Sequence, residues 1–249
     1  MVNILISGYY GFDNIGDESI LRTLVSSLRE HIPDCSLTVL SHNPASTREK
    51  YGVEAVDRMS PMAILRAVKK CDMLISGGGS LLQDVTSSKS LHYYLSIIRC
   101  AEFFHKKVFI YSQGIGPIDR PGNRRAAAAA LKRADGIVVR DERSAALLEE
   151  IGIARDKVVI TADPVIRMKK PDGDVGAEIL RKAGVSLDGR LTVGWAIRER
   201  DTDSRFVKEL LRSIQMMKDK YNAQSVLIPF HYEEDGEVCR HIAAQLPDD

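Results

Sequence analysis

The sequence predicts an α/β protein built on parallel, doubly wound sheets. Short apolar runs rich in β-branched residues alternate with segments that carry apolar residues at helical spacing. Strands that alternate with helices pair in parallel as βαβ units, and strands buried on both faces read as continuous apolar runs. A change of composition near residue 164 further predicts that the chain divides into two lobes.

The first lobe is predicted to cover residues 1–164. In its first helix an apolar stripe recurs every three or four residues from Ile20 to Leu28. The predicted strands of this lobe are 2–7, 36–41, 72–76, 107–112, 136–140 and 157–161. The predicted helices lie near 17–31, 60–70, 87–105, 121–134 and 142–151.

The second lobe is predicted to cover residues 177–249, after a linker at 165–176. The linker is predicted from its proline, glycine and charged residues, and an ordinary surface loop is the alternative. Free-standing α/β domains usually need about 100 residues, so we expect the second lobe to be incomplete and the sequence to be a fragment. Its predicted elements are helix 177–183, strand 191–197, helix 203–220, strand 225–230 and helix 234–246.

Composition excludes several function classes. The net charge of +1 gives no global field that would attract nucleic acid. The four cysteines lie far apart without a CxxC pair, which predicts reduced thiols and no structural zinc. No HExxH or similar pattern appears, so no metal site is predicted. The start resembles no signal peptide and no apolar run reaches membrane-spanning length, which predicts a cytoplasmic protein.

The most informative segment is GYYGFDNIGDE at residues 8–18, between the first predicted strand and helix. Its glycines, among them Gly11 and Gly16, allow a sharp turn and close approach of a ligand to the backbone. Asp13, Asn14 and Asp17 stand where the helix begins. There they can cap the helix or meet a substrate hydroxyl, and the residues leave both roles open.

The common nucleotide motifs do not fit this segment. A Walker A loop needs a Lys-Ser or Lys-Thr pair after its last glycine, and none follows Gly16. A dinucleotide fingerprint needs GxGxxG and an acidic residue at the end of the second strand. The spacing differs here, and the second predicted strand ends in Ser41-His42-Asn43. NAD is therefore not the predicted ligand.

Two glycine-rich loops follow later strands of the first lobe. In an open α/β sheet, ligands bind at the carboxyl edge of the strands, where both loops are predicted to lie. The triple glycine is more than a plain turn needs, so it is predicted to offer bare amides to an anion or a sugar hydroxyl. A tight βα turn is the alternative. The residues predicted to line the site here are Gly77, Gly78, Gly79, Ser80, Gln113, Gly114 and Gly116.

Arg140 ends an apolar strand, where a buried guanidinium needs an anionic partner. That partner is a substrate phosphate or carboxylate gripped by the guanidinium fork, or it is Asp141 or Asp163 in a purely structural pair. Both alternatives stay open. Asp163 precedes Pro164. It can cap a helical turn, act at a hinge or bind substrate.

Two residues of the second lobe are also predicted to bind substrate. Arg198 stands at the end of predicted strand 191–197, just as Arg140 stands at the end of predicted strand 136–140. His231 follows predicted strand 225–230, where a histidine can move protons because its ordinary pKa lies near 6.5. A surface-loop histidine is the alternative.

Together these loops resemble the polysaccharide pyruvyl transferase family, in particular its CsaB-type members. The matching segments, in order, are GYYGFDNIGDE, SGGGSLLQD, QGIGP, VRDERS and ADP. They cover the first lobe, and the match continues less distinctly through WAIRER and LIPFHYEED. The family's later Arg-Leu-His segment and lysine-containing loop have no counterpart in this sequence.

The resemblance implies two facing Rossmann-like lobes of the glycosyltransferase-B kind. It also implies transfer of a pyruvyl group from phosphoenolpyruvate, with no cofactor, to a sugar of a cell-wall polysaccharide or its lipid-linked precursor. The resulting ketal anchors surface-layer proteins in this branch. A place at the inner face of the membrane and a homo-oligomeric state are compatible with such a role.

The resemblance also suggests residue roles. Asp13, Asp17 and Arg140 are the catalytic candidates: the two carboxylates would orient or deprotonate acceptor hydroxyls, and Arg140 would clamp the donor together with Arg198. Asn14 and the two glycine loops would line the acceptor side. A glycosyltransferase-B enzyme that uses a nucleotide sugar and a non-catalytic carbohydrate-binding protein remain as alternatives.

Overall fold

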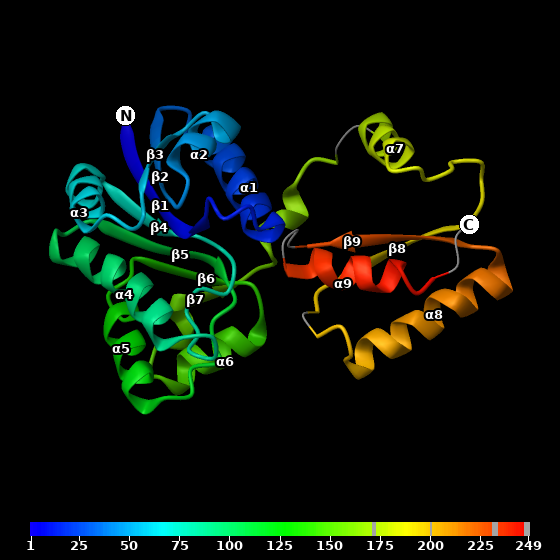
Figure 1. The fold of residues 1–249 in the computed structure, drawn as a ribbon. Helices are drawn as coiled ribbons and strands as arrows, with labels where there is room; N and C mark the ends of the chain where they lie inside the picture. The colour runs from blue at the N-terminus through cyan, green and yellow to red at the C-terminus, as the bar shows by residue number, and fades with distance from the viewer. Residues whose placement is uncertain (171–172, 200, 231–233, 247–249) are drawn as a thin grey trace. The chain divides into compact units, whose positions relative to one another are not determined.

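The chain folds into two compact units, Met1–Met168 and Lys169–Asp249 (Figure 1). The structure is a computed structural model that describes residues 1–170, 173–199, 201–230 and 234–246. Each unit holds a parallel sheet with helices packed against it.

The first unit contains a parallel sheet with the strand order β3-β2-β1-β4-β5-β6-β7. Strand β1 lies inside the sheet. Strands β2 and β3 follow on one side of it, and β4 to β7 follow on the other side. The order therefore reverses between β1 and β4, which is the arrangement that opens a ligand crevice at the carboxyl edge. The strands are Val2–Tyr10 (β1), Cys35–Ser41 (β2), Glu54–Asp57 (β3), Met73–Ser76 (β4), Lys107–Gln113 (β5), Gly136–Val139 (β6) and Val158–Ile160 (β7).

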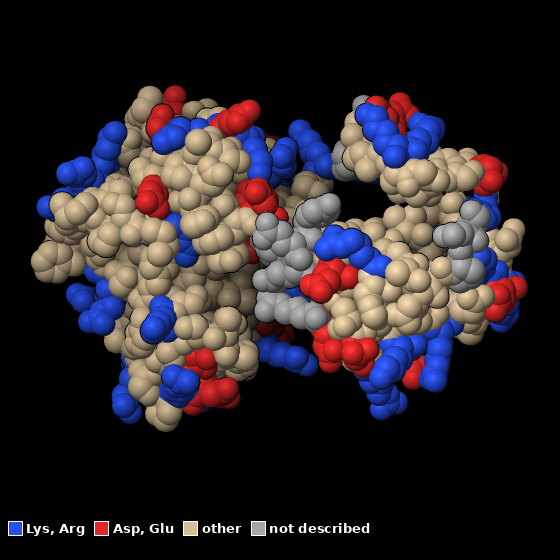
Figure 2. Space-filling view, viewed as in Figure 1, with Lys and Arg blue, Asp and Glu red and all other residues tan. Residues whose placement is uncertain are grey.

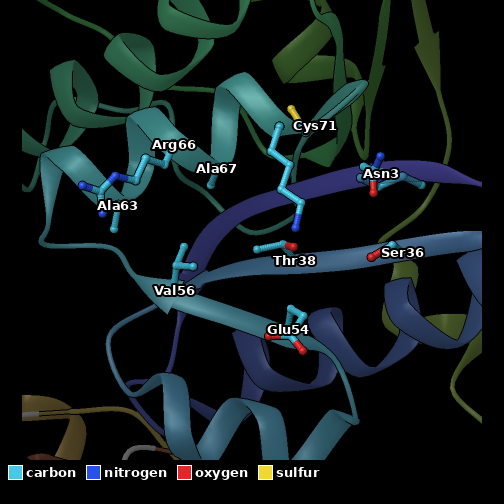
Figure 3. Close-up of a pocket in the computed structure, with 11 residues that line it drawn as sticks. Asn3, Ser36, Thr38, Glu54, Val56, Ala63, Arg66, Ala67 and Cys71 are labelled. Carbon is cyan, nitrogen blue, oxygen red and sulfur yellow. The ribbon is translucent and has the colours of Figure 1, made fainter.

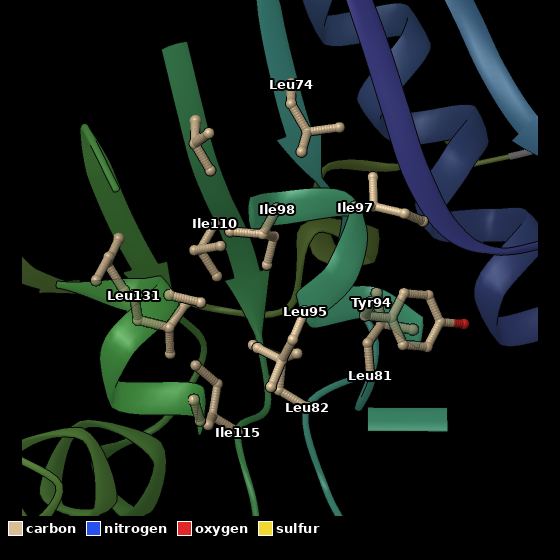
Figure 4. Packing of buried hydrophobic residues seen from close by; sticks show 14 of the residues in the cluster. Leu74, Leu81, Leu82, Tyr94, Leu95, Ile97, Ile98, Ile110, Ile115 and Leu131 are labelled. Carbon is tan, nitrogen blue, oxygen red and sulfur yellow. The ribbon is translucent and has the colours of Figure 1, made fainter. Parts of the chain in front are cut away.

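Two apolar cores fill the two faces of this sheet. The larger core gathers residues from the strands and from α3, α4, α5 and α6, among them Leu74, Ile98 and Ile110 (Figure 4). The smaller core lies under α1 and includes Leu21 and Leu24. The helices are Ile15–His31 (α1), Pro44–Tyr51 (α2), Pro61–Lys70 (α3), Ser88–Phe103 (α4), Pro121–Leu131 (α5) and Glu142–Glu150 (α6), with short 3-10 turns at Arg155–Lys157 (η1) and Pro164–Arg167 (η2).

The sheet of the first unit has one strand more than the sequence predicted. The segment between β2 and α3 forms α2 and the four-residue edge strand β3. Only Thr47 and Tyr51 of α2 are buried, and only Ala55 of β3 is buried. So few buried residues leave no apolar periodicity to read, and the prediction of six strands is wrong for that reason.

Helix α4 includes the aromatic segment LHYYLSIIRCAEF. Leu91, Tyr94, Leu95 and Ile98 of this helix are buried against the sheet. The exception is Phe103 at its end, which is 76% exposed. The segment therefore packs in the core.

The second unit pairs β8 (Thr192–Ile197) with β9 (Gln224–Pro229) in parallel. Ile197 joins apolar residues of α8 (Arg205–Tyr221) and α9 (Glu234–Ala243) in a small core. The remaining helix, α7 (Gly173–Lys182), has no buried residue. The segment 165–176, predicted as a linker, is partly helical, because it includes most of η2 and the start of α7.

Charges of both signs are interspersed over the visible face of each unit (Figure 2). This agrees with 35 basic and 34 acidic residues in the whole chain. Across the described residues, every helix is too short or too polar to cross a membrane.

Candidate functional site

The carboxyl edge of the first unit's sheet collects most of the residues predicted from the sequence. Parallel strands end on the same side, so the β1–α1 turn, the loop after β4 and the loop after β5 share this edge. Arg140 directly follows β6, and Asp163 comes after β7.

The β1–α1 turn begins with a break in strand pairing. Ser7 pairs with Leu40 and Tyr10 with Ser41, so two residues of β1 bulge out of the register. As a result Tyr9 is 39% exposed, whereas Tyr10 is completely buried. Burial raises the pKa of the Tyr10 hydroxyl well above its ordinary value, and Asp17 adds to the effect.

Side chains of α1 close this turn. Glu18 accepts a hydrogen bond from the backbone N–H of Gly11 at 2.8 Å and another from the Tyr51 hydroxyl. Asn14 is the N-cap of α1, and its Oδ1 accepts from the N–H groups of Gly16 (3.0 Å) and Asp17 (3.1 Å). The capping role that the sequence left open for Asn14 is therefore present.

Asp13 occupies the tip of the turn with a positive φ of 55°. Asp tolerates this left-handed region better than most residues. Its carboxylate is 75% exposed and lies 2.6 Å from the ammonium of Lys50 on α2. The hydrogen bond from Lys50 to Asp13 raises the pKa of Lys50.

The triple glycine after β4 is explained by packing. A β-carbon on Gly77 would overlap the Tyr10 hydroxyl, and one on Gly78 would lie 2.9 Å from Ile20. One on Gly79 would lie 2.8 Å from the Asp17 carboxylate. The expectation that a turn here needs fewer glycines is wrong, because α1 and Tyr10 approach the loop too closely for side chains.

Gln113 lies beneath this loop and is fully buried. Its Nε2 donates to the backbone oxygen (3.0 Å) and hydroxyl (2.8 Å) of Ser76, and the next N–H, of Gly114, donates to Gly79 at 2.9 Å. Among the residues the structure describes, the Gln113 Oε1 and the Tyr10 hydroxyl are buried without a hydrogen-bond partner. Gln113 thus supports the loop from below.

Arg140 has the two carboxylate partners that the sequence offered as the structural alternative. It donates to Asp163 at 2.9 Å and to the Ser80 hydroxyl at 3.0 Å, and its Nε lies 3.8 Å from Asp141. Gly114 makes room for the guanidinium, because a β-carbon there would lie 2.8 Å from it. The side chain keeps 31% of its surface exposed.

The two carboxylates beside Arg140 also cap helical turns. Asp163 accepts from the N–H of Val165 at the start of η2 (3.1 Å). Asp141 accepts from the N–H and hydroxyl of Ser144 in α6. Burial works to raise the pKa of Asp141, but these hydrogen bonds outweigh it and the pKa is lowered.

A hollow of about 440 Å³ opens beside Arg140. Gly116, with φ of 92°, lies in its wall, where a β-carbon would overlap Leu147. Arg124 and Arg143 also line it. Asp141 and Glu150 line the same recess, and Arg124 already donates to the Ile118 carbonyl at 2.7 Å and to Glu150 at 3.2 Å.

A second hollow, of about 480 Å³, lies at the opposite edge of the sheet (Figure 3). Its lining includes Asn3, Ser36 and Glu54, which stand near the amino ends of β1, β2 and β3, and Cys71 after α3. None of the predicted site residues lines this hollow, and in an open α/β sheet ligands bind at the carboxyl edge.

Sequence reasoning missed Arg58, which follows β3 and is only 6% exposed. Its guanidinium donates to the Gly8 carbonyl at 2.8 Å and to the Tyr94 hydroxyl at 3.2 Å. The rings of Tyr9, Phe12, Tyr93 and Tyr94 surround it, with centroids 4.7–5.7 Å from its Cζ. No pattern in the sequence pointed to Arg58, because β3, the strand that it follows, was not predicted.

The predicted residues of the second unit are described in part. Arg198 is exposed and directly follows β8. His231 lies outside the described residues. Within those residues, no three His, Cys, Asp or Glu side chains group closely enough to hold a metal ion.

The model of the polysaccharide pyruvyl transferase family matches residues 14–247. The chain belongs to this family. The amylovoran biosynthesis protein AmsJ of Erwinia amylovora is 24% identical to it, and the match covers 80% of this chain and 57% of AmsJ. The chain thus spans little more than half of that relative's length.

Solved structures with similar folds come from sugar-nucleotide enzymes. A candidate UDP-N-acetylglucosamine 2-epimerase from Listeria monocytogenes has a TM-score of 0.63 and 11% identity, covering 100% of this chain and 67% of its own. Anabaena Alr3699/HepE in complex with UDP-glucose has a TM-score of 0.61 and 12% identity, covering 98% and 66%. These likenesses confirm the predicted glycosyltransferase-B type of α/β fold.

Proposed function

We propose that the protein transfers a pyruvyl group from phosphoenolpyruvate to two hydroxyls of one sugar in a polysaccharide or its lipid-linked precursor. The observation that carries this proposal is the family match across residues 14–247. The crowding of carboxylates and guanidinium groups at the carboxyl edge of the first unit supports it, because the reaction needs both.

The chemistry balances with two hydroxyls and no additional cofactor. A proton added to the methylene carbon of phosphoenolpyruvate makes a methyl group and leaves cationic character on the adjacent carbon. One sugar hydroxyl adds to that carbon, the phosphate leaves with its oxygen, and the second hydroxyl adds to close the ketal. The two hydroxyls lose two protons. One balances the proton that was added to the methylene carbon, and the other leaves with the phosphate.

Asp13 and Asp17 are our candidates on the acceptor side. The exposed Asp13 carboxylate is the kind of group that orients a hydroxyl or removes its proton. Its partner Lys50 is itself 43% exposed, so a substrate hydroxyl can compete for the same carboxylate.

Arg140 is our candidate on the donor side. Asp163 and Ser80 hold its guanidinium in a fixed orientation, so little freedom is lost when an anion binds. Arg143 in the same recess adds a second guanidinium for a phosphate or carboxylate, whereas Arg124 there is paired with Glu150. Arg198 and His231 stay our candidates for donor binding and proton transfer, from their places after two predicted strands of the second lobe.

The finer identity of the acceptor is part of the same proposal. We propose a cell-wall polysaccharide whose ketal anchors surface-layer proteins, made in the cytoplasm at the inner face of the membrane. A homo-oligomeric assembly is compatible with this role.

The test is direct pyruvylation. The protein is incubated with phosphoenolpyruvate and an acceptor that contains β-N-acetylmannosamine, and phosphate release is followed together with the acceptor's mass. We expect phosphate and a pyruvylated acceptor to appear in equal amounts, and Asp13→Asn to slow both. Thermal stabilisation by UDP-sugars, with neither stabilisation nor turnover from phosphoenolpyruvate, would instead favour a nucleotide-sugar glycosyltransferase.

A further inference from the structure

Three aromatic rings at the carboxyl edge of the first unit form a single stack. The centroids of Tyr9 and Phe12 are 4.1 Å apart with an interplanar angle of 6°, and those of Phe12 and His42 are 4.4 Å apart at 5°. Two parallel rings cannot share one face of Phe12 at these distances, so Phe12 lies in the middle. Tyr9 and His42 are therefore the outer rings, and both are exposed.

The backbone sets this ring stack in place. The bulge in β1 turns Tyr9 outward, and the N–H of His42 donates to the carbonyl of Tyr10 at 2.9 Å. The ends of β1 and β2 are thus joined just where the rings emerge. Arg58 lies beside the stack, with its Cζ 5.1 Å from the Phe12 centroid and 5.7 Å from that of Tyr9.

The support from Arg58 is rigid because Arg58 is buried and fixed by other contacts. It bonds the Gly8 carbonyl, and its own carbonyl accepts from the Tyr93 hydroxyl at 3.0 Å. The outer faces of Tyr9 and His42 therefore point in opposite directions, and the exposed ring of His42 offers one flat face of fixed orientation.

Polar groups stand beside this surface. Asp13 follows Phe12 directly, and its exposed carboxylate pairs with Lys50. One face of a pyranose ring is lined by C–H groups, whereas its rim carries hydroxyls that donate and accept. An aromatic plane next to a carboxylate and an ammonium matches both features.

We propose that the outer face of His42, backed by the rings of Phe12 and Tyr9, binds a pyranose ring of the acceptor, with Asp13 and Lys50 meeting its hydroxyls. This inference rests on the proposed function, since it assigns the acceptor's place in it. A nucleobase would also stack on such rings, but its phosphates would meet the exposed Asp13 carboxylate. A neutral sugar is therefore the favoured ligand.

The test measures sugar binding without turnover. Saturation-transfer NMR is recorded with methyl β-glucoside, methyl β-galactoside, methyl N-acetyl-β-mannosaminide and uridine monophosphate, each titrated to obtain a Kd. We expect at least one glycoside to bind through its C–H face. His42→Ala should weaken that binding about tenfold, equivalent to 1.4 kcal/mol.

Phe103→Ala is the matched control. Phe103 is an exposed aromatic residue at the end of α4, near the amino edge of the sheet, and its loss should leave every Kd unchanged. An unchanged Kd in His42→Ala overturns the proposal. So does a lack of binding by all three glycosides, or stacking by uridine monophosphate alone.

Transfer assays on the same variants separate this proposal from the proposed function. Glycoside binding that depends on His42, without any phosphate release, would contradict the proposed pyruvyl transfer and support the sugar-binding surface. Turnover with the same acceptor KM in His42→Ala and in the unmodified protein would contradict the sugar-binding surface and support the pyruvyl transfer.

Discussion

The β1–α1 turn and the recess around Arg140 lie on the same edge of one sheet, yet their charged groups are held differently. At the turn, Asp13 is 75% exposed and its partner Lys50 is exposed as well. In the recess, Arg140 is 31% exposed and is bonded to both Asp163 and Ser80. The first arrangement lets a substrate replace a weak partner, whereas the second presents a charge that is already oriented.

The difference also separates residues that contact ligand from residues that hold loops. Glu18, Asn14 and Gln113 have polar atoms engaged in the turn or the loops. Their substitution should act first on stability. Asp13 and the outer rings of the stack have few such duties, so their substitution should act on binding and turnover.

The largest effect is expected from Gly77→Ala. The added methyl would overlap the buried Tyr10 hydroxyl, which has no room to move, and we expect a loss of about 3 kcal/mol in unfolding free energy. Urea denaturation measures it. Gly122→Ala in α5, where nothing lies within 4 Å, is the control and should cost nothing. Equal stability of the two variants would refute the packing explanation of the triple glycine.

Arg58→Met should have the next largest effect. The substitution keeps the chain length but leaves the Gly8 carbonyl without its donor and removes the cation from the aromatic rings. We expect about 2 kcal/mol of destabilisation by urea denaturation. If stability instead stays within error of the unmodified protein, Arg58 does not support the turn.

Asp84, in the loop after β4, offers a pH-dependent comparison. It is 6% exposed and accepts hydrogen bonds from the N–H groups of Asp119 and Arg120 and from Asn123. Burial works to raise its pKa, but these bonds outweigh it and lower the pKa below 3.8. The stabilisation is thus full above 3.8 and is lost as the pH falls through the lowered pKa.

Asp84→Asn should therefore destabilise the protein by about 1 kcal/mol at neutral pH, as loss of a helix cap does. The difference between variant and unmodified protein should shrink as the pH falls below 3.8. Thermal unfolding across pH 7 to 3 measures it. A difference that stays constant over this range would contradict the role of the ionised carboxylate.

The smallest effect is expected for the pair Arg140–Asp163. Because both side chains are partly exposed, their coupling in a double-mutant cycle of Arg140→Gln and Asp163→Asn should be about 0.5 kcal/mol. A coupling several times larger would show that the pair exists for stability, and would weaken the case for Arg140 as a donor contact.

The sequence predicted the parallel α/β fold and the family because both depend on long apolar runs and on loops contiguous in the chain. It missed β3 and therefore Arg58, because a four-residue edge strand carries no periodic signal. It also could not predict that Tyr9, Phe12 and His42 stack. Their contact depends on a bulge and on pairing between β1 and β2, which are distant in sequence.

The glycines show a further limit of sequence reasoning. A glycine that admits a ligand and a glycine that admits a neighbouring side chain look the same in sequence. Gly77 and Gly114 prove to face Tyr10 and Arg140. Only the three-dimensional neighbours decide between the two explanations.

The most direct test of this account is a steady-state comparison of Asp13→Asn with Arg140→Gln in the pyruvylation assay. We predict that Asp13→Asn lowers kcat/KM for the acceptor about 100-fold and leaves the KM for phosphoenolpyruvate unchanged. Arg140→Gln should instead raise the KM for phosphoenolpyruvate. If both variants change the same parameter, or neither changes any, the assignment of the acceptor to the β1–α1 turn and of the donor to the recess around Arg140 is wrong.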